Sequence, residues 1–223
     1  MPVPSQGPAD TDGPRDLTDL LAESDTATEA RQTAILEAAI GLFREKPLHH
    51  VSLDQVAEAA GMSMDELAAV HPTLDDLVVA VIRAWNQRRT APLVPIAGSH
   101  GAAAFLRAIV LANVSDPALM LLMTAAAPIA ASADLPMASQ LQQQWVHFHA
   151  LVQRALAHDI AVGREPETME PARGAEQLIA TYEGLQLQSM VRPHMDVVEA
   201  YDRAVTRLRD GWSRSYTPPV WEI

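Results

Sequence analysis

The sequence offers few residues at spacings that support catalysis or metal binding. It contains no cysteine, which excludes disulfides and thiolate chemistry and fits a reducing compartment. His147 and His149 are two residues apart, so on a helix their side chains diverge and form a poor metal pair. No phosphate-binding loop and no nucleophile with a partner base is evident. The sequence therefore predicts a protein that is not an enzyme and that has no metal and no resident cofactor.

Two four-residue segments have the form of a capping box. In Ser52-Leu-Asp-Gln55 and Ser63-Met-Asp-Glu66, the hydroxyl and the side chain three residues later satisfy each other's free backbone amides. Between them, Gly61 can adopt the left-handed conformation that ends one helix and leads into the next. Two short capped helices joined by a tight turn predict a helix-turn-helix, which places one helix in the major groove of DNA. A generic three-helix bundle is the alternative interpretation.

Helical periodicity surrounds these boxes, and nothing resembles a strand hairpin. The first helix is expected to start at Thr28 and to end near Pro47, with an apolar face formed by Ile35, Ala39, Leu42 and Phe43. A longer fourth helix follows Thr73, and its apolar stripe is Leu74, Leu77, Val78, Val81, Ile82 and Trp85. The cations towards its C-terminal end, which are expected to be solvated and to complement the helix dipole, are Arg83, Arg88 and Arg89.

Pro92, Pro95 and Gly98 interrupt this pattern and mark the passage from a head to a body. Five further helices are expected at about 102–114, 116–131, 137–162, 171–191 and 194–215. The predicted fold class is all-α with about nine helices, an N-terminal three-helix head and a larger C-terminal body. The predicted organisation is a leader (1–27), a DNA-binding-type domain (28–75), a ligand-binding and dimerisation domain (76–217) and a tail (218–223).

The composition of the chain limits where in the cell the protein is expected. The chain has 223 residues, of which 48% are hydrophobic, an ordinary fraction for a globular protein. No apolar run approaches the roughly 20 residues that span a bilayer, and the N-terminus does not have the pattern of a signal peptide. We expect a cytoplasmic protein that does not enter a membrane.

Three stretches of the chain, taken together, resemble the tetracycline-repressor (TetR) family of transcriptional regulators. They are RQTAILEAAIGLF (31–43), VSLDQVAEAAGMS (51–63) and YEGLQLQSMVRP (182–193). They are similar to the family's first helix, to its second helix and turn, and to the helix that pairs subunits. The resemblance covers nearly the whole chain after Thr28.

The resemblance implies contacts of the head with DNA. Ser52 and Gln55 match positions that can meet the DNA backbone, while Ser63, Met64 and Asp65 belong to the start of the recognition helix. Other positions depart from the family pattern. Ala68 stands where a tyrosine is expected, Val70 and His71 where aromatic residues are usual, and Leu74 where a phosphate-binding lysine is usual.

Charge departs from the family pattern as well. The chain has a net charge of −12, and its leader holds six carboxylates against Arg15 alone. Residues 28–77 contain only Arg31, Arg44 and Lys46 against nine carboxylates. A carboxylate about 6 Å from a phosphate costs roughly 1 to 3 kcal/mol, so this head should repel DNA at long range. Three histidines lie around the motif: His49, His50 and His71. Their protonation below about pH 6.5 would reduce the deficit of positive charge in the head.

The leader's prolines and glycines favour disorder, apart from a short helix around Leu17, Leu20 and Leu21. In the body, the resemblance implies a site for a small apolar or amphipathic effector among the middle helices. Its candidate lining is Phe105, Met120, Met123, Met137, Trp145, Phe148 and His149. Methionine-rich cavities suit adaptable binding, and His149 can orient a polar group of a ligand, but plain hydrophobic core is the alternative for the whole set.

The last two predicted helices have apolar stripes that suit pairing of subunits. The residues taken as the dimer interface are Leu178, Tyr182, Leu185, Ser189, Tyr201, Val205 and Leu208. Two such helices from each subunit can form a four-helix interface with two-fold symmetry, in a homodimer or in a heterodimer with a relative.

These observations favour a ligand-responsive regulator, most simply a repressor whose homodimer binds palindromic double-stranded DNA and is released by a small-molecule effector. The alternative is a TetR-like module that has weakened or lost DNA binding and acts as a protein-binding co-regulator. The acidic head favours this alternative.

Overall fold

The computed structural model describes residues 17–132 and 138–214, and every regular element in these ranges is helical. The described residues form ten α-helices and two short 3-10 helices, so the predicted all-α fold is confirmed. The head contains α1 (Leu17–Glu45), η1 (Leu48–His50), α2 (Leu53–Ala60) and α3 (Met64–Ala68). The connecting helices are α4 (Leu74–Thr90), η2 (Ala91–Leu93) and α5 (Val94–His100). The rest of the body contains α6 (Ala102–Ser115), α7 (Ala118–Ala131), α8 (Ala138–Ala161), α9 (Pro171–Val191) and α10 (Val197–Trp212).

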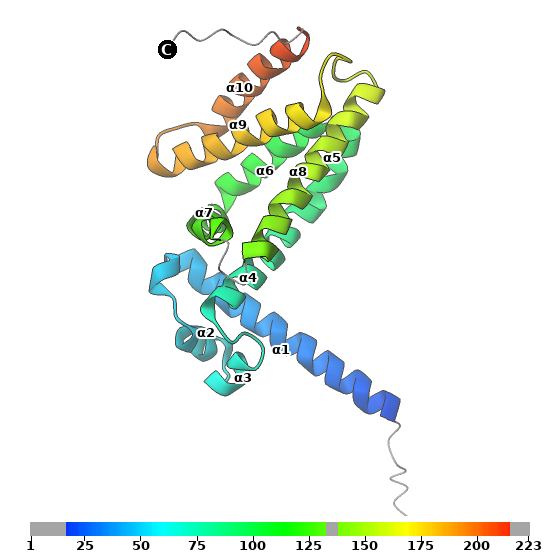
Figure 1. The fold of residues 1–223 in the computed structure, drawn as a ribbon. Coiled ribbons are helices and arrows are strands. Elements are labelled where there is room, and N and C mark those ends of the chain that lie inside the picture. The colour runs from blue at the N-terminus through cyan, green and yellow to red at the C-terminus, as the bar shows by residue number, and fades with distance from the viewer. Residues whose placement is uncertain (1–16, 133–137, 215–223) are drawn as a thin grey trace, which may run out of the picture.

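The head lies at one end of an elongated molecule, and the C-terminal helices lie at the other (Figure 1). Helix α4 runs from the head into the body. It packs against α1 in the head and against α7 and α8 in the body. Helix α7 also packs against α1, so two body-forming helices support the first helix of the head.

Two hydrophobic clusters hold these elements together. The first joins α1 to α4 and continues into α7 and the start of α8, through residues such as Ile35, Leu77 and Leu119. The second lies deeper in the body among α6, α8, α9 and α10, with Phe105 and Tyr201 among its largest fully buried side chains. The head therefore shares a continuous apolar core with the part of the body nearest to it.

Polar contacts add to this junction. The Arg44 guanidinium on α1 donates to the Asp116 carboxylate at 2.7 Å, between α6 and α7. It also lies over the Trp85 ring, 4.9 Å from the ring centroid. Arg88 of α4 pairs with Glu37 of α1. Exposed ion pairs contribute little stability, so these pairs orient the head more than they stabilise it.

Helix α1 begins earlier than the sequence pattern predicted. The leader was expected to be disordered up to residue 27 apart from a short helix around Leu17, Leu20 and Leu21. That short helix is present, but it is continuous with the next one and runs from Leu17 through Thr28 to Glu45. Between Leu17 and Thr28 there is no proline or glycine, so no helix-breaking residue separates the predicted short helix from the helix that follows it. The start of the leader and the tail at 218–223 lie outside the described residues.

The predicted break between head and body is helical too. Pro92 lies in the first turn of η2 and Pro95 in the first turn of α5, where the missing N–H is not needed. The prolines therefore start new helices in place of an extended linker. Helix α9 has the predicted bounds, and the other body helices agree with the prediction to within a few residues.

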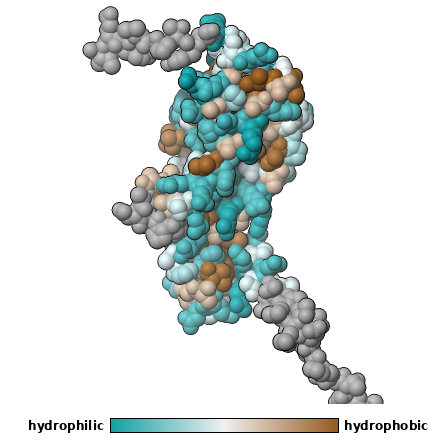
Figure 2. Space-filling model, turned by 45° about the vertical axis from the view of Figure 1, so that its right-hand side comes forward, coloured by the Kyte–Doolittle hydropathy of each residue, from teal (hydrophilic) through white to brown (hydrophobic). Residues whose placement is uncertain are grey.

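One face of the molecule is mostly hydrophilic, with apolar side chains in separate patches (Figure 2). Among the described residues, no single helix has the length and hydropathy of a membrane span. Only α6 and α7 taken together reach that composition, and they are bent by 103° relative to each other.

Candidate functional site

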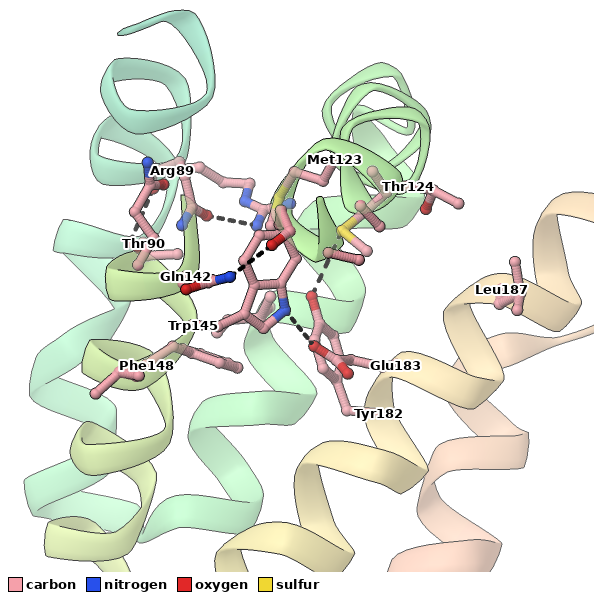
Figure 3. Close-up of a pocket in the computed structure, with 18 residues that line it drawn as sticks. Arg89, Thr90, Met123, Thr124, Gln142, Trp145, Phe148, Tyr182, Glu183 and Leu187 are labelled. Carbon is pink, nitrogen blue, oxygen red and sulfur yellow. Dashed lines mark hydrogen bonds between the residues drawn. The ribbon is translucent and has the colours of Figure 1, made fainter. Parts of the chain in front are cut away.

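A cavity of about 680 Å³ opens in the body beside the junction with the head. Its walls come from α4, α6, α7, α8 and α9, and they are mostly apolar. This volume and lining are typical of sites for small organic ligands. Figure 3 shows side chains from α4, α7, α8 and α9 gathered around it.

The structure places four of the seven predicted effector residues on this cavity. They are Met120, Met123, Trp145 and Phe148. Phe105 does not line it: this residue is fully buried in the second cluster, and Ile109, one turn further along α6, lines the cavity in its place. His149 is also absent from the lining, because one helical step turns it away from the face that carries Phe148. Met137 lies outside the described residues.

The cavity wall has a polar group that the sequence pattern did not reveal. Arg89 was predicted to be solvated, but its side chain is half-buried and lines the cavity. Its guanidinium donates to the Oδ1 atom of Asn113 and, at 2.8 Å, to the Oδ1 atom of Asn86. Its Nε atom is buried and has no hydrogen-bond partner. Burial lowers the pKa of Arg89 from its usual value, because water no longer stabilises the charge.

Tyr182 completes this polar group. Its hydroxyl accepts a hydrogen bond from the Asn113 amide at 3.0 Å and donates to the Met120 sulfur at 3.6 Å. Burial raises the pKa of Tyr182, so the phenol is neutral at ordinary pH. Because Asn113 contacts both Arg89 and Tyr182, the three side chains form one network that joins α4, α6 and α9.

More exposed contacts lie around the same cavity. The Trp145 indole N–H donates to the Glu183 carboxylate at 3.1 Å, and the Gln142 amide donates to the Ala130 carbonyl at 2.7 Å. Figure 3 shows Trp145 between Arg89 on one side and Tyr182 and Glu183 on the other. The cavity thus combines an apolar lining, one positive group in its wall and one carboxylate at a more exposed position.

Both predicted capping boxes of the head are confirmed. The Ser52 hydroxyl accepts from the Gln55 amide N–H at 3.4 Å, and the Gln55 side chain accepts from the Ser52 N–H at 3.2 Å. The Ser63 N–H and hydroxyl donate to the Glu66 carboxylate at 2.9 and 2.8 Å. Gly61 between them has a φ of 68°, the left-handed conformation that the turn requires.

The predicted DNA-contacting residues have different exposures. Ser52, Ser63 and Asp65 are exposed, Gln55 is half-buried, and Met64 is half-buried and packs against the core of the head. The side chains of Ser52 and Ser63 already have partners within the capping boxes. Contacts of these residues with DNA stay a prediction.

The face formed by α2 and α3 is acidic. Its exposed carboxylates are Asp54, Glu58, Asp65 and Glu66. The hydrogen bonds from Ser63 lower the pKa of Glu66, which keeps this carboxylate charged. Of the head's three cations, Arg44 is engaged by Asp116 at the junction with the body. The structure therefore does not relieve the charge deficit seen in the sequence.

His71 does not supply the missing charge. It is buried, its Nε2 atom has no hydrogen-bond partner, and burial lowers its pKa. A buried imidazole of this kind stays neutral as the pH falls below its usual pKa. This finding corrects the hypothesis that protonation of His71 would help to bind DNA, whereas His49 and His50 are exposed in η1.

Metal binding has no support in the described part of the chain, where no group of three or more histidine, aspartate or glutamate side chains is placed to hold an ion.

Known structures share this arrangement of helices. A TetR transcription regulator from Haloarcula marismortui aligns with 82% of this chain and 97% of its own, with a TM-score of 0.68 and 15% sequence identity. The structure of SmeT in complex with triclosan aligns with 86% of this chain and 100% of its own, with a TM-score of 0.61 and 22% identity. The chain has the TetR fold.

Sequence similarity to a curated protein covers a shorter part of the chain than the structural similarity does. The HTH-type transcriptional regulator RutR from Escherichia coli (strain K12) is 37% identical over 67 residues, which are 30% of this chain and 32% of RutR. The match thus spans about a third of the curated relative. No protein-family profile matches the chain. RutR and the Haloarcula marismortui protein are transcription regulators, and SmeT is the repressor of a multidrug efflux pump in Stenotrophomonas maltophilia.

Within the TetR fold, most of the predicted dimer residues face the core of their own subunit. Leu178, Tyr182, Tyr201 and Val205 are buried in the isolated chain, and Leu185, Ser189 and Leu208 are half-buried. The buried four are therefore corrected to core residues. Periodicity identifies an apolar face, but it does not distinguish a face that packs within a subunit from one that packs between subunits.

Proposed function

We propose that the protein is a ligand-responsive transcriptional repressor, which binds palindromic operator DNA as a homodimer and is released by a small molecule in the body cavity. One observation carries this proposal. The cavity is lined by α4 and α7, and the same two helices pack against α1 of the head. An occupant that shifts either helix would change the position of the head.

The neighbouring structures support the same assignment. They are transcription regulators of the TetR fold, and SmeT was solved in complex with triclosan, a small molecule. The cavity here has the size and apolar lining for an effector of comparable kind. Coupling requires that the effector bind the DNA-competent and DNA-incompetent arrangements with different affinities.

We assign dimerisation to the outward face of α9. Ala180, Gly184, Leu187 and Val191 follow each other at helical spacing on this face. Leu187 is 54% exposed and Val191 is 74% exposed, although both are large and apolar. Gly184 leaves open space where a side chain would stand. A second copy of the same face can pack there across a two-fold axis, and small residues allow the helices to approach closely.

A specific observation favours a second candidate function. The exposed carboxylates of α2 and α3 give the head the wrong charge for phosphate contacts. A chain of this fold with such a head can act through protein contacts, as a co-regulator that has weakened or lost its affinity for DNA.

Salt-dependent DNA binding separates the two functions. Binding to random and upstream genomic duplexes would be measured at about 50 mM and about 200 mM salt. The repressor should prefer a palindrome, and its affinity should fall steeply with salt because each phosphate contact releases a counterion. Absence of binding to any duplex at the lower salt, with the assembly intact by sedimentation, would contradict the repressor function and favour the co-regulator.

A further inference from the structure

We propose that the cavity binds an amphipathic acid, whose anionic group is held by Arg89 and whose apolar part lies against Met120, Met123 and Phe148. The proposal deepens the proposed function, because it names the chemical class of the effector. Two features of the cavity support this class of ligand: the positive charge in its wall and the apolar nature of the remaining lining.

Arg89 differs from the other partly buried arginines of the described chain. Arg164 pairs with Asp159 at 2.7 Å, and Arg107 pairs with Asp202 at 2.7 Å. For Arg89, the described residues offer no carboxylate within ion-pair distance, and its guanidinium donates to the amide oxygens of Asn113 and Asn86, which are neutral. A cation withdrawn from water without a counterion is unfavourable. An anionic ligand would supply the missing negative charge.

The nearby carboxylates do not take this role. Asp116 favours the charged form of Arg89 from a distance, but it is already paired with Arg44. Glu183 lines the cavity, but it accepts the hydrogen bond of the Trp145 indole and is exposed to solvent. The guanidinium therefore keeps donor capacity for a ligand. Carboxylates match its planar donors better than any neutral acceptor does.

The rest of the cavity suits an apolar group. Ile109 and Ala127 continue the surface formed by the two methionines and Phe148. The volume of about 680 Å³ is far larger than an isolated carboxylate needs. Methionine side chains adapt to ligands of different shape, so the apolar part of the ligand is less restricted than its charge.

The test compares three probes that share one alkyl chain: decanoate, decan-1-ol and decyltrimethylammonium. Binding to the full-length protein without DNA would be measured by isothermal titration calorimetry. Decanoate should bind at least about ten-fold more tightly than decan-1-ol, since a charged hydrogen bond is stronger than a neutral one. Decyltrimethylammonium should bind most weakly. Equal affinity for decanoate and decan-1-ol, or no binding of decanoate, would overturn the proposal.

Variants then assign the preference to one side chain. Arg89→Gln should remove the preference for decanoate and leave the affinity for decan-1-ol within about three-fold, because only the anion contact is lost. Arg83→Gln is the matched control, since Arg83 is exposed on the same helix and does not line the cavity.

If circular dichroism shows that Arg89→Gln does not fold, Arg89→Lys serves instead. It should keep the order of the probes but weaken decanoate, because lysine lacks the planar pair of donors. An unchanged preference in a folded Arg89→Gln variant, or unchanged decanoate affinity in Arg89→Lys, contradicts the role of Arg89.

This result is separable from the proposed function. If the protein prefers decanoate through Arg89 but does not bind an operator, the proposal of an anionic ligand stands and the proposed repressor function is wrong. If the protein binds an operator and another ligand releases it, without any preference for decanoate, the repressor function stands and the proposal of an anionic ligand is wrong.

Discussion

Three side chains in the described chain have a buried nitrogen without a hydrogen-bond partner: His71, Arg89 and Gln186. The first two can carry charge, and burial lowers the pKa of each because it removes water from the charged form. The consequences differ. His71 is buried in the head and can remain neutral, whereas Arg89 lines a cavity in which a ligand can approach it. At the scale of the residue, the same physical cost gives a pH-sensitive group in the head and a candidate anion site in the body.

His71 should make stability depend on pH. Its pKa is lowered in the folded chain, so the unfolded chain takes up a proton below about pH 6.5 before the folded chain does. The free energy of unfolding should therefore be fully retained above that pH and should fall as the pH decreases, by at most about 1.4 kcal/mol per pH unit for one proton. His71→Gln, which cannot titrate, should lose less stability than the wild type between pH 7.5 and pH 5.5 in urea unfolding.

His147→Gln is the control for this prediction, because His147 is exposed on α8 and also loses an imidazole. It should follow the pH dependence of the wild type. If His71→Gln follows it equally closely, burial of His71 has no part in the acid sensitivity of the protein.

At the scale of the element, the head depends on its helix caps. Helices α2 and α3 have eight and five residues, too short to be stable in isolation. Their capping boxes satisfy backbone amides at both starts, and Leu67 and Val56 anchor the helices in the core. Caps and core residues together hold α3 in position, so loss of a cap should lower the stability of the whole head.

Replacement of the α3 cap should destabilise the head by a definite amount. Ser63→Ala removes the hydroxyl that accepts from the Glu66 N–H, and it should lower the free energy of unfolding by about 1 kcal/mol. Ser63→Asn should remain within a few tenths of a kcal/mol of the wild type, because asparagine is an equally good cap. Equilibrium unfolding in urea checks both, and equal losses in the two variants would show that capping is not the role of Ser63.

Helix α4 illustrates how one element serves two ends of the molecule. Its first part packs in the core of the head through Leu77 and Val78, and its last part presents Asn86 and Arg89 to the cavity. A helix is stiff over this length, so displacement at one end is transmitted to the other. The ion pair of Arg44 with Asp116 lies beside this path and orients α1 against the start of α7.

At the scale of the whole molecule, the isolated chain leaves an apolar stripe on α9 that its own core does not cover. Ala180→Glu combined with Val191→Glu should weaken dimerisation at least ten-fold, since each charge would be buried against its own copy in an isologous interface. Sedimentation velocity over a range of concentrations measures this change. The double variant should still fold, because both residues are exposed in the subunit.

Val162→Glu provides the comparison for the dimer prediction. Val162 is also apolar and 50% exposed, but it follows the end of α8, away from the stripe. It should leave the assembly unchanged. If the double variant also leaves it unchanged, or if the wild type is monomeric at all concentrations, the assignment of α9 as the interface is wrong.

The helices and their starts could be predicted from the sequence because their causes are local. Capping boxes act over three residues and an apolar face repeats every three to four, so Ser52, Ser63 and the bounds of α9 followed from the neighbouring residues alone. The position of Met120, Met123, Trp145 and Phe148 inside the body was predicted for a related reason, because apolar side chains at helical spacing had to face inward.

Only the tertiary structure decided which residues each apolar helix face packs against. Tyr182 was predicted to contact a second subunit, but it packs inside its own beside Asn113, which is far away in the sequence. Arg89 was predicted to be solvated, but the packing of α7 and α8 against α4, together with Asn113 of α6, partly encloses it. A helical pattern specifies the direction of a side chain relative to its own axis. Its partner and its solvation depend on how distant helices pack, and this packing is what made a cavity with a positive wall.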